Sequence, residues 1–198
     1  MRKDYQVILY FIPTLSKILY IGFSDGELIN LLSQKGVSCQ GVEIDQEKVV
    51  KCLEKGLDVI QGDINHIVDN FPHNQFDFCI LTQTIQTVQK PDILLNELKK
   101  IGKNIIVSFS NSAHIGKITK FLFSGSFNSL LKKSTNDQWF DTYNIHPCSI
   151  KDFQILALSL NLQILSTYDL DNLKKFKNSQ IPSNLFCKDV LFHLVNEQ

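Results

Sequence analysis

The strongest constraint on the fold is a regular alternation of apolar runs with amphipathic segments. Residues 17–23 (KILYIGF) and 76–82 (FDFCILT) are continuous apolar runs of the kind expected for buried parallel strands. Residues 27–34 follow the first run with leucines at helical spacing, and Gly36 supplies a helix end. Repeated strand–helix units of this kind predict a mostly parallel, doubly wound α/β sheet with helices on both faces.

The same reasoning places the remaining elements. We expect further helices at 45–56, 91–102, 115–123 and 149–160, and further strands at 40–44, 58–61, 104–109, 162–170 and 189–196. A polar insertion, at about 110–148, follows the fifth strand. Because loop 172–184 contains no long helix, we expect the last two strands to pair as an antiparallel hairpin. Residues 1–198 fit a single domain.

The charge balance limits the classes of partner. Lys plus Arg and Asp plus Glu each number 20, so the formal net charge is zero. This balance argues against nucleic acid, which is bound through clustered positive charge. Arg2 is the single arginine, so we expect little bidentate guanidinium recognition of phosphate or carboxylate. A small ligand or a protein partner needs no excess of charge.

The cysteines and the N-terminal segment predict a cytoplasmic protein with neither a metal site nor a membrane span. The five cysteines include no CxxC pair, and no Cys or His pair has the spacing of zinc ligands. We therefore expect reduced, mostly buried thiols. The first apolar run is broken by Pro13 and falls short of the ~20 apolar residues of a membrane span. It also lacks a signal-peptide cleavage site.

Polar residues follow several of the predicted strands, where ligands of doubly wound sheets bind. Gly22 and Ser24 lie in the turn after the first strand. Glu43 ends the second strand, where a carboxylate can accept hydrogen bonds from two ribose hydroxyls. Asp63 follows the third strand and can accept the amino group of an adenine ring, and residues 82–84 (TQT) end the fourth. Each alone is more often a helix cap or a solvated loop residue, but the set predicts an adenosine site.

Longer stretches of the chain carry a family resemblance. They read DGEL at 25–28, GVEID at 41–45, VIQGD at 59–63, LTQTIQ at 81–86 and IVSFSN at 106–111. With QWFDTYNIH at 138–146, they resemble the methionine biosynthesis protein MetW family of the class I S-adenosylmethionine-dependent methyltransferase superfamily. The resemblance covers nearly the whole chain. It implies a Rossmann-like, seven-stranded methyltransferase fold with a C-terminal antiparallel hairpin.

The resemblance also implies a cofactor and a partner. The cofactor would be S-adenosylmethionine or S-adenosylhomocysteine, held by Gly22, Phe23, Ser24, Asp25, Glu43, Ile44, Gly62, Asp63, Ile64, Thr82 and Gln83. The family is associated with the homoserine O-acyltransferase step of methionine synthesis, so that acyltransferase is the implied protein partner.

Two departures from the family pattern predict weakened cofactor binding. Tyr20 stands where the family has an acidic residue that helps to hold the ammonium of the cofactor, and Ser24 replaces a glycine. A serine there meets a steric cost if the loop keeps a positive φ. Loss of one charge-assisted hydrogen bond costs ~1.5–3 kcal/mol, or roughly 10- to 150-fold in affinity.

The methyl-acceptor side offers three weaker candidates. His146 is a potential general base, because imidazole titrates near neutral pH, or else a structural hydrogen-bonding group. Asn111 and His114 are candidate pocket residues. Two functions stay open: methyl transfer to a small molecule, and a non-catalytic partner that binds and activates homoserine O-acyltransferase. A nicotinamide-dependent reductase is disfavoured by the expected hairpin and the incomplete glycine loop.

Overall fold

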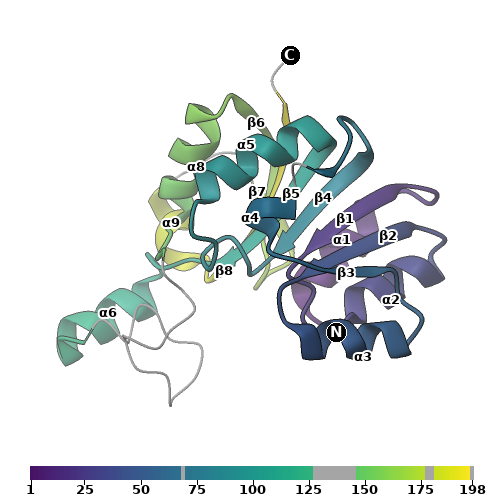
Figure 1. Cartoon of the computed structure of the whole chain (residues 1–198). Helices are drawn as coiled ribbons and strands as arrows, with labels where there is room; N and C mark the ends of the chain where they lie inside the picture. Colours follow the sequence, from purple (N-terminus) through teal and green to yellow (C-terminus); the bar gives the residue numbers. More distant parts are fainter. Residues whose placement is uncertain (68–69, 127–145, 177–180, 197–198) are drawn as a thin grey trace.

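The computed structural model describes residues 1–67, 70–126, 146–176 and 181–196. Its strands form an eight-stranded sheet in the order β3-β2-β1-β4-β5-β8-β6-β7 (Figure 1). The strands are β1 (Lys17–Ile21), β2 (Ser38–Glu43), β3 (Val59–Gln61), β4 (Phe76–Thr82), β5 (Gly102–Ser110), β6 (Leu162–Asp169), β7 (Lys174–Phe176) and β8 (Asp189–Asn196). The first five strands pair in parallel, as the sequence predicts. The strand order reverses between β1 and β4.

The C-terminal part of the sheet is antiparallel. β8 lies between β5 and β6 and pairs antiparallel with both, which confirms the expected pairing of the last two strands. The methyltransferase-like sheet is confirmed, and it carries one edge strand in addition to the seven expected, because Lys174–Phe176 pairs with the end of β6. The segment predicted as a loop at 172–184 thus contains β7 and the start of α9 (Ile181–Phe186).

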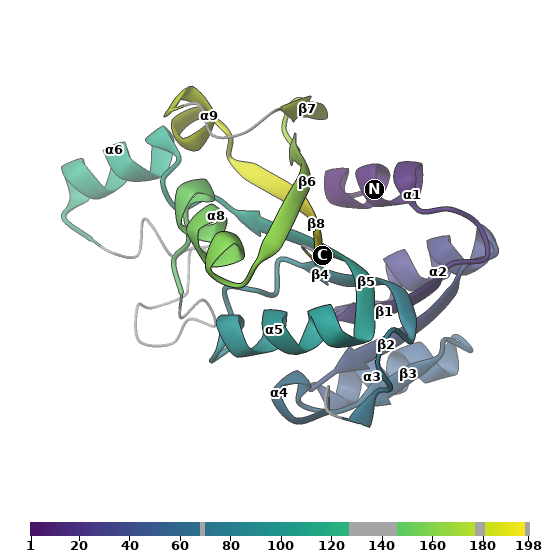
Figure 2. The same ribbon diagram turned by 90° about the horizontal axis from the view of Figure 1, so that it is seen from above.

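Helices cover both faces of the sheet. On one face lie α1 (Lys3–Phe11), α2 (Glu27–Gln34) and α3 (Gln46–Glu54), which bury side chains in one core cluster. On the other lie α5 (Pro91–Ile101) and α8 (Ile150–Ser159), which contribute to a second cluster together with Ile64 of the short α4 (Ile64–Ile67). Figure 2 shows α1 and α2 opposite α5 and α8.

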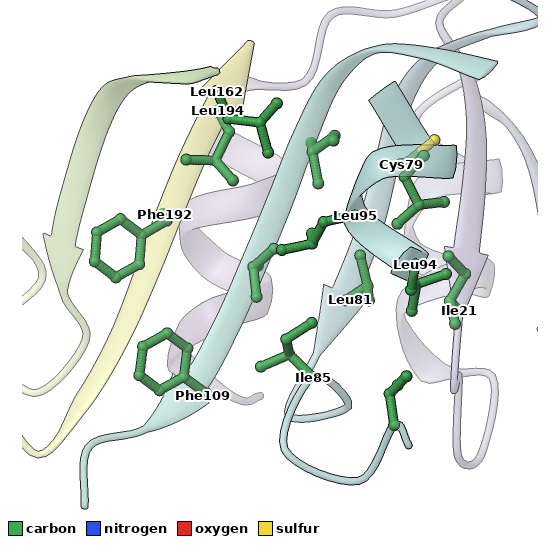
Figure 3. Close-up of a cluster of buried hydrophobic side chains, with 14 of the residues drawn as sticks. Ile21, Cys79, Leu81, Ile85, Leu94, Leu95, Phe109, Leu162, Phe192 and Leu194 are labelled. Atoms are coloured by element: carbon green, nitrogen blue, oxygen red, sulfur yellow. The ribbon is translucent and has the colours of Figure 1, made fainter. Parts of the chain in front are cut away.

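The buried strands explain why their sequences are continuously apolar. Successive residues of a strand point to opposite faces. Leu19 and Ile21 therefore enter the cluster beneath α5, while Ile18 and Tyr20 enter the one beneath α1 and α2. Figure 3 shows part of the cluster beneath α5, in which Leu94 and Leu95 of this helix face the sheet. Every face is covered, so no alternation of polar residues remains in the central strands.

The N-terminal apolar run is a helix rather than an irregular segment, which the sequence alone did not predict. α1 buries Tyr5 and Ile8 against the sheet, and Ile12 caps its end just before Pro13. Proline is common directly after a helix, because it cannot continue one. The break at Pro13 therefore marks the end of α1.

Much of the predicted insertion lies outside the described residues. Its described part contains α6 (Ile115–Ser124), which extends away from the sheet in both views (Figures 1 and 2). Of the family signature at 138–146, only His146 belongs to the described residues. Within the described ranges, no helix is long and apolar enough to cross a membrane.

The five cysteines are free, and four of them are buried. Burial raises the pKa of the Cys39, Cys148 and Cys187 thiols to about 12. They are therefore protonated packing groups rather than reactive thiolates. No cluster of metal-ligating side chains occurs among the described residues.

Candidate ligand-binding site

A cavity of about 620 Å³ lies at the carboxyl ends of the parallel strands, where the strand order reverses. Nine of the residues that the sequence analysis selected line it: Gly22, Ser24, Glu43, Ile44, Gly62, Asp63, Ile64, Thr82 and Gln83. They come together because parallel strands end at the same edge of a sheet. Residues outside the predicted cofactor-binding set complete the wall: Arg2, Ile21, Val42, Asp45, Lys48, Thr84, Thr87, Val88 and Gln89.

The floor of the cavity is the turn after β1. Gly22 has φ +69°, and its N–H donates to the Val42 carbonyl at 2.9 Å. A Cβ at this position would lie 2.5 Å from Oγ1 of Thr84, so the turn requires glycine for its conformation and for space. Ser24 has φ 55°, which confirms that a serine here occupies the left-handed region.

Two residues of the same turn face elsewhere. Phe23 is fully buried and packs over Gly41 of β2, where an added Cβ would lie 2.6 Å from Cδ1 of Phe23. Oδ1 of Asp25 accepts the Glu27 N–H at 3.1 Å, at the start of α2. Neither residue lines the cavity, so the structure assigns core packing to Phe23 and helix capping to Asp25.

Glu43 is held with one oxygen engaged and the other open. Its side chain is 7% exposed, and Oε1 accepts the backbone N–H groups of Ile44 at 3.0 Å and Asp45 at 3.3 Å. Oε2 has no hydrogen-bond partner in the described part of the chain. Because no buried side-chain oxygen there lacks a partner, Oε2 must be accessible from the cavity. The carboxylate is thus oriented by the backbone and offers one acceptor to a ligand.

A main-chain hydrogen bond between β2 and the residue before Asp63 brings Asp63 close to Glu43. The Gly62 N–H donates to the Glu43 carbonyl at 3.0 Å, which joins the ends of β2 and β3. The Asp63 carbonyl then accepts the N–H groups of His66 and Ile67 at the start of α4. Ile44, which is 65% exposed, adds an apolar surface to this acidic end of the cavity.

At the end of the cavity over β1 and β4, Tyr20 occupies the position where the family pattern has an acidic residue. Tyr20 is fully buried, and its hydroxyl lies 2.5 Å from Oγ1 of Thr82 and 3.5 Å from the hydroxyl of Tyr5. Burial raises the pKa of the Tyr20 phenol well above its usual value. The position that is acidic in the family pattern therefore holds a neutral hydroxyl beneath Thr82.

Arg2 lines the cavity at this same end. Its Nε and Nη2 donate to the two oxygens of Asp4 at 3.1 and 2.6 Å, and Nη1 donates to the Tyr5 hydroxyl at 3.1 Å. The Ser108 hydroxyl of β5 donates to Asp4 at 3.1 Å. The expectation of little guanidinium recognition of ligands stays a prediction; within the chain, this arginine forms a forked pair with the Asp4 carboxylate and lines the cavity. Composition could not show that α1 carries it to the cavity.

None of the three candidate acceptor-side residues lines the cavity. Asn111 is fully buried, with Nδ2 donating to the carbonyls of Asn184 and Cys187 at 2.7 and 2.8 Å. Nδ1 of His114 accepts the Gly116 N–H and caps α6. Nε2 of His146 lies 3.1 Å from the Gln89 carbonyl, one residue behind the cavity wall. All three make structural hydrogen bonds.

The residue types at one end of this cavity are those that could hold an adenosine, and those at the other end offer less to an amino-acid chain. The open Glu43 oxygen, Asp63 and the Gly22 turn supply what a ribose and an adenine require. The opposite end presents Thr82 and Arg2 and lacks the acidic partner of an ammonium group.

Solved structures with the same arrangement of elements include several S-adenosylmethionine-dependent methyltransferases. A TehB-like enzyme from Corynebacterium glutamicum is 13% identical, with a TM-score of 0.66 and coverage of 99% of this chain and 88% of its own. One from Methanosarcina mazei is 14% identical, with a TM-score of 0.69 and coverage of 96% of each chain. The fold is therefore that of the class I S-adenosylmethionine-dependent methyltransferases.

Within this class the chain belongs to the MetW family. The family model, described as methionine biosynthesis protein MetW, matches residues 2–194. A similar curated protein is the bifunctional methionine biosynthesis protein MetXA/MetW of Rhodopirellula baltica, which is 29% identical over 208 residues. That match covers 99% of this chain and 33% of the relative, so the chain spans one third of the relative's length.

Proposed function

We propose that the cavity binds S-adenosylmethionine or S-adenosylhomocysteine through the adenosine half of the molecule. The observation that carries this proposal is Glu43, whose carboxylate is fixed by two backbone N–H groups while Oε2 stays open to the cavity. Oε2 would accept the ribose hydroxyls, Asp63 the adenine amino group, and Ile44 and Ile64 would contact the ring. When bound, S-adenosylmethionine supplies a transferable methyl group.

Calorimetric titration with S-adenosylhomocysteine tests this site. In Glu43→Gln the amide oxygen can still accept the two backbone N–H groups, but the amide NH₂ replaces the open acceptor. We expect a loss of affinity of about 10- to 150-fold with an unchanged fold, because one charge-assisted hydrogen bond is removed. Glu54→Gln, on the exposed last turn of α3, is the matched control and should bind like the parent. Equal affinities for the two variants would contradict the proposal.

We further propose that the protein acts beside homoserine O-acyltransferase, as a regulatory partner rather than as a catalyst. The bifunctional MetXA/MetW relative supports this role, since it joins two methionine biosynthesis functions in one chain. The engaged hydrogen bonds of Asn111, His114 and His146 also favour it, because they leave these groups outside the cavity. Methyl transfer to a small molecule is the alternative function.

Two measurements separate these roles. For a regulatory partner, we expect the purified protein to co-elute with the acyltransferase of the same genome and to change its rate of homoserine acylation. For a methyltransferase, label from methyl-labelled S-adenosylmethionine should appear in a small molecule when the protein is incubated with a metabolite extract. Absence of co-elution together with an unchanged acylation rate would contradict the regulatory role.

A further inference from the structure

Glu43 and Asp63 lie at a different part of the row of strand ends from Arg2, and the ion pair of Asp45 and Lys48 at the start of α3 adds one charge of each sign after β2. Glu43 and Asp63 follow β2 and β3, on one side of the switch point. Arg2 lies toward the other side, because its partner Asp4 accepts from Ser108 of β5 and its partner Tyr5 approaches Tyr20 of β1. An adenosine held at the acidic end would direct its 5′ substituent across β1 and β4 toward the guanidinium.

The guanidinium, which lines the cavity, keeps two N–H donors that no described group accepts. The hydrogen bonds to Asp4 and Tyr5 use three of its five N–H groups in the described structure. Nε and Nη2 share the carboxylate of Asp4, so the remaining N–H groups belong to Nη1 and Nη2. Asp4 is 4% exposed, whereas the Arg2 side chain is 39% exposed and lines the cavity. A ligand therefore meets the cation, while its counter-ion lies behind it.

The environment keeps the Arg2 guanidinium charged. Burial disfavours the charged guanidinium, but the hydrogen bond and the charge of Asp4 outweigh it and leave the pKa of Arg2 above its usual value. The Tyr20 phenol stays neutral at the position where a carboxylate would bind an ammonium. A planar guanidinium with two adjacent donors matches the geometry of a carboxylate.

We propose that the cavity selects adenosine ligands by a carboxylate on the 5′ substituent, bound by Arg2, and that an ammonium on the same substituent adds no affinity. This inference rests on the proposed adenosine site and extends it to the other half of the ligand. It differs from the family pattern, in which an acidic residue holds the amino group, because Tyr20 stands at that position and Arg2 lines the cavity.

Four thioether probes test the inference by calorimetric titration of the parent protein. They are S-adenosylhomocysteine, its analogue without the amino group, its analogue without the carboxyl group, and neutral 5′-methylthioadenosine. We expect the carboxylate-only analogue to bind at least as tightly as S-adenosylhomocysteine. The amine-only analogue should bind no more tightly than methylthioadenosine. An amine-only analogue that binds more tightly than the carboxylate-only one would overturn the inference and leave the adenosine site standing.

An Arg2 variant assigns the effect to this side chain. Arg2→Gln should weaken the carboxylate-bearing probes by about 10- to 150-fold and leave methylthioadenosine within about two-fold, so the neutral probe reports an intact site. Arg2→Lys should recover part of the loss, because lysine keeps the positive charge but lacks the two adjacent donors of a guanidinium. An equal loss for all four probes would overturn the role of Arg2. Should Arg2→Gln not fold, the four probes measured on the parent protein still show whether the carboxylate or the ammonium contributes to affinity. No binding of any probe at millimolar concentration would overturn the adenosine site itself.

Discussion

At the scale of single residues, the site depends on backbone conformations that few side chains tolerate. Gly22 and Ser24 both have positive φ, yet the two positions differ in space. Gly22 is confined by Thr84, whereas Ser24 carries its side chain at the cavity. The serine is tolerated because a left-handed conformation costs a non-glycine residue about 1–2 kcal/mol, which a fold can absorb. A clash with neighbouring atoms would come in addition.

Gly22→Ala tests this distinction. Gly36 also has positive φ, and an added Cβ there meets nothing within 4 Å, so Gly36→Ala isolates the conformational cost. We expect Gly36→Ala to lower the free energy of unfolding by about 1 kcal/mol. Gly22→Ala should lower it by a further 1–3 kcal/mol or so, because its Cβ meets Thr84. Urea denaturation measures both, and Thr84→Ala in the Gly22→Ala background should recover part of the difference. Equal losses for the two alanines would show that Thr84 gives way freely.

At the scale of elements, α8 shows how a local sequence fixes where a helix begins. The Ser149 hydroxyl accepts the Asp152 N–H at 3.1 Å, and the Asp152 carboxylate accepts the Ser149 N–H at 3.0 Å. This capping box satisfies two backbone donors at the start of the helix. α8 packs on the sheet through Phe153 and Ala157, so its start also sets which side chains enter the core.

Ser149→Ala should therefore destabilise the whole protein. We expect the free energy of unfolding to fall by about 1 kcal/mol, within the 0.5–2 kcal/mol usual for loss of such a cap. Chemical denaturation followed by circular dichroism is the measurement. Ser33→Ala, at an exposed position of α2, removes a hydroxyl without a capping role and should leave stability within about 0.5 kcal/mol. A loss at Ser33 as large as at Ser149 would rule out the cap as the cause.

Elements with a local signal were predictable, and those that depend on distant partners were not. Strand β4 and helix α2 match their predicted bounds because each is a complete apolar or amphipathic run. Strand β7 has three residues, two of them exposed lysines, and its extended state depends on pairing with β6. Such a short segment shows no hydrophobic periodicity of its own, so its sequence predicts a loop.

The residues of the site also divide into those that were predictable from the sequence and those that were not. Glu43 and Asp63 were predictable because the ends of parallel strands meet at one edge, whatever the side-chain packing. Arg2 was not, since its place at the cavity depends on how α1 docks and on contacts with Asp4 and Tyr5. Phe23 was assigned to the site by its position in the turn, but the direction of its side chain depends on the space over Gly41.

At the scale of the whole molecule, α1 and β8 join the parallel and antiparallel parts of the sheet. Nε2 of His193 on β8 donates a hydrogen bond to Oδ1 of Asn104 on β5 at 2.8 Å. Its ring stacks on Phe11 of α1 with centroids 5.4 Å apart. One imidazole of the C-terminal strand thus contacts the N-terminal helix and a central strand.

The pH dependence of stability should reflect this contact. Burial, with a smaller contribution from the charge of Lys175, lowers the pKa of His193 below its usual value. Between the folded and unfolded pKa values the unfolded chain binds more protons, so stability falls as the pH drops below about 6.5. We expect the free energy of unfolding in urea to be lower at pH 5 than at pH 7.5, by up to about 1.4 kcal/mol per unit of pKa difference. His193→Gln should reduce this decline, whereas His73→Gln, at an exposed position before β4, should retain it. A decline that survives unchanged in His193→Gln would assign the pH dependence to other groups.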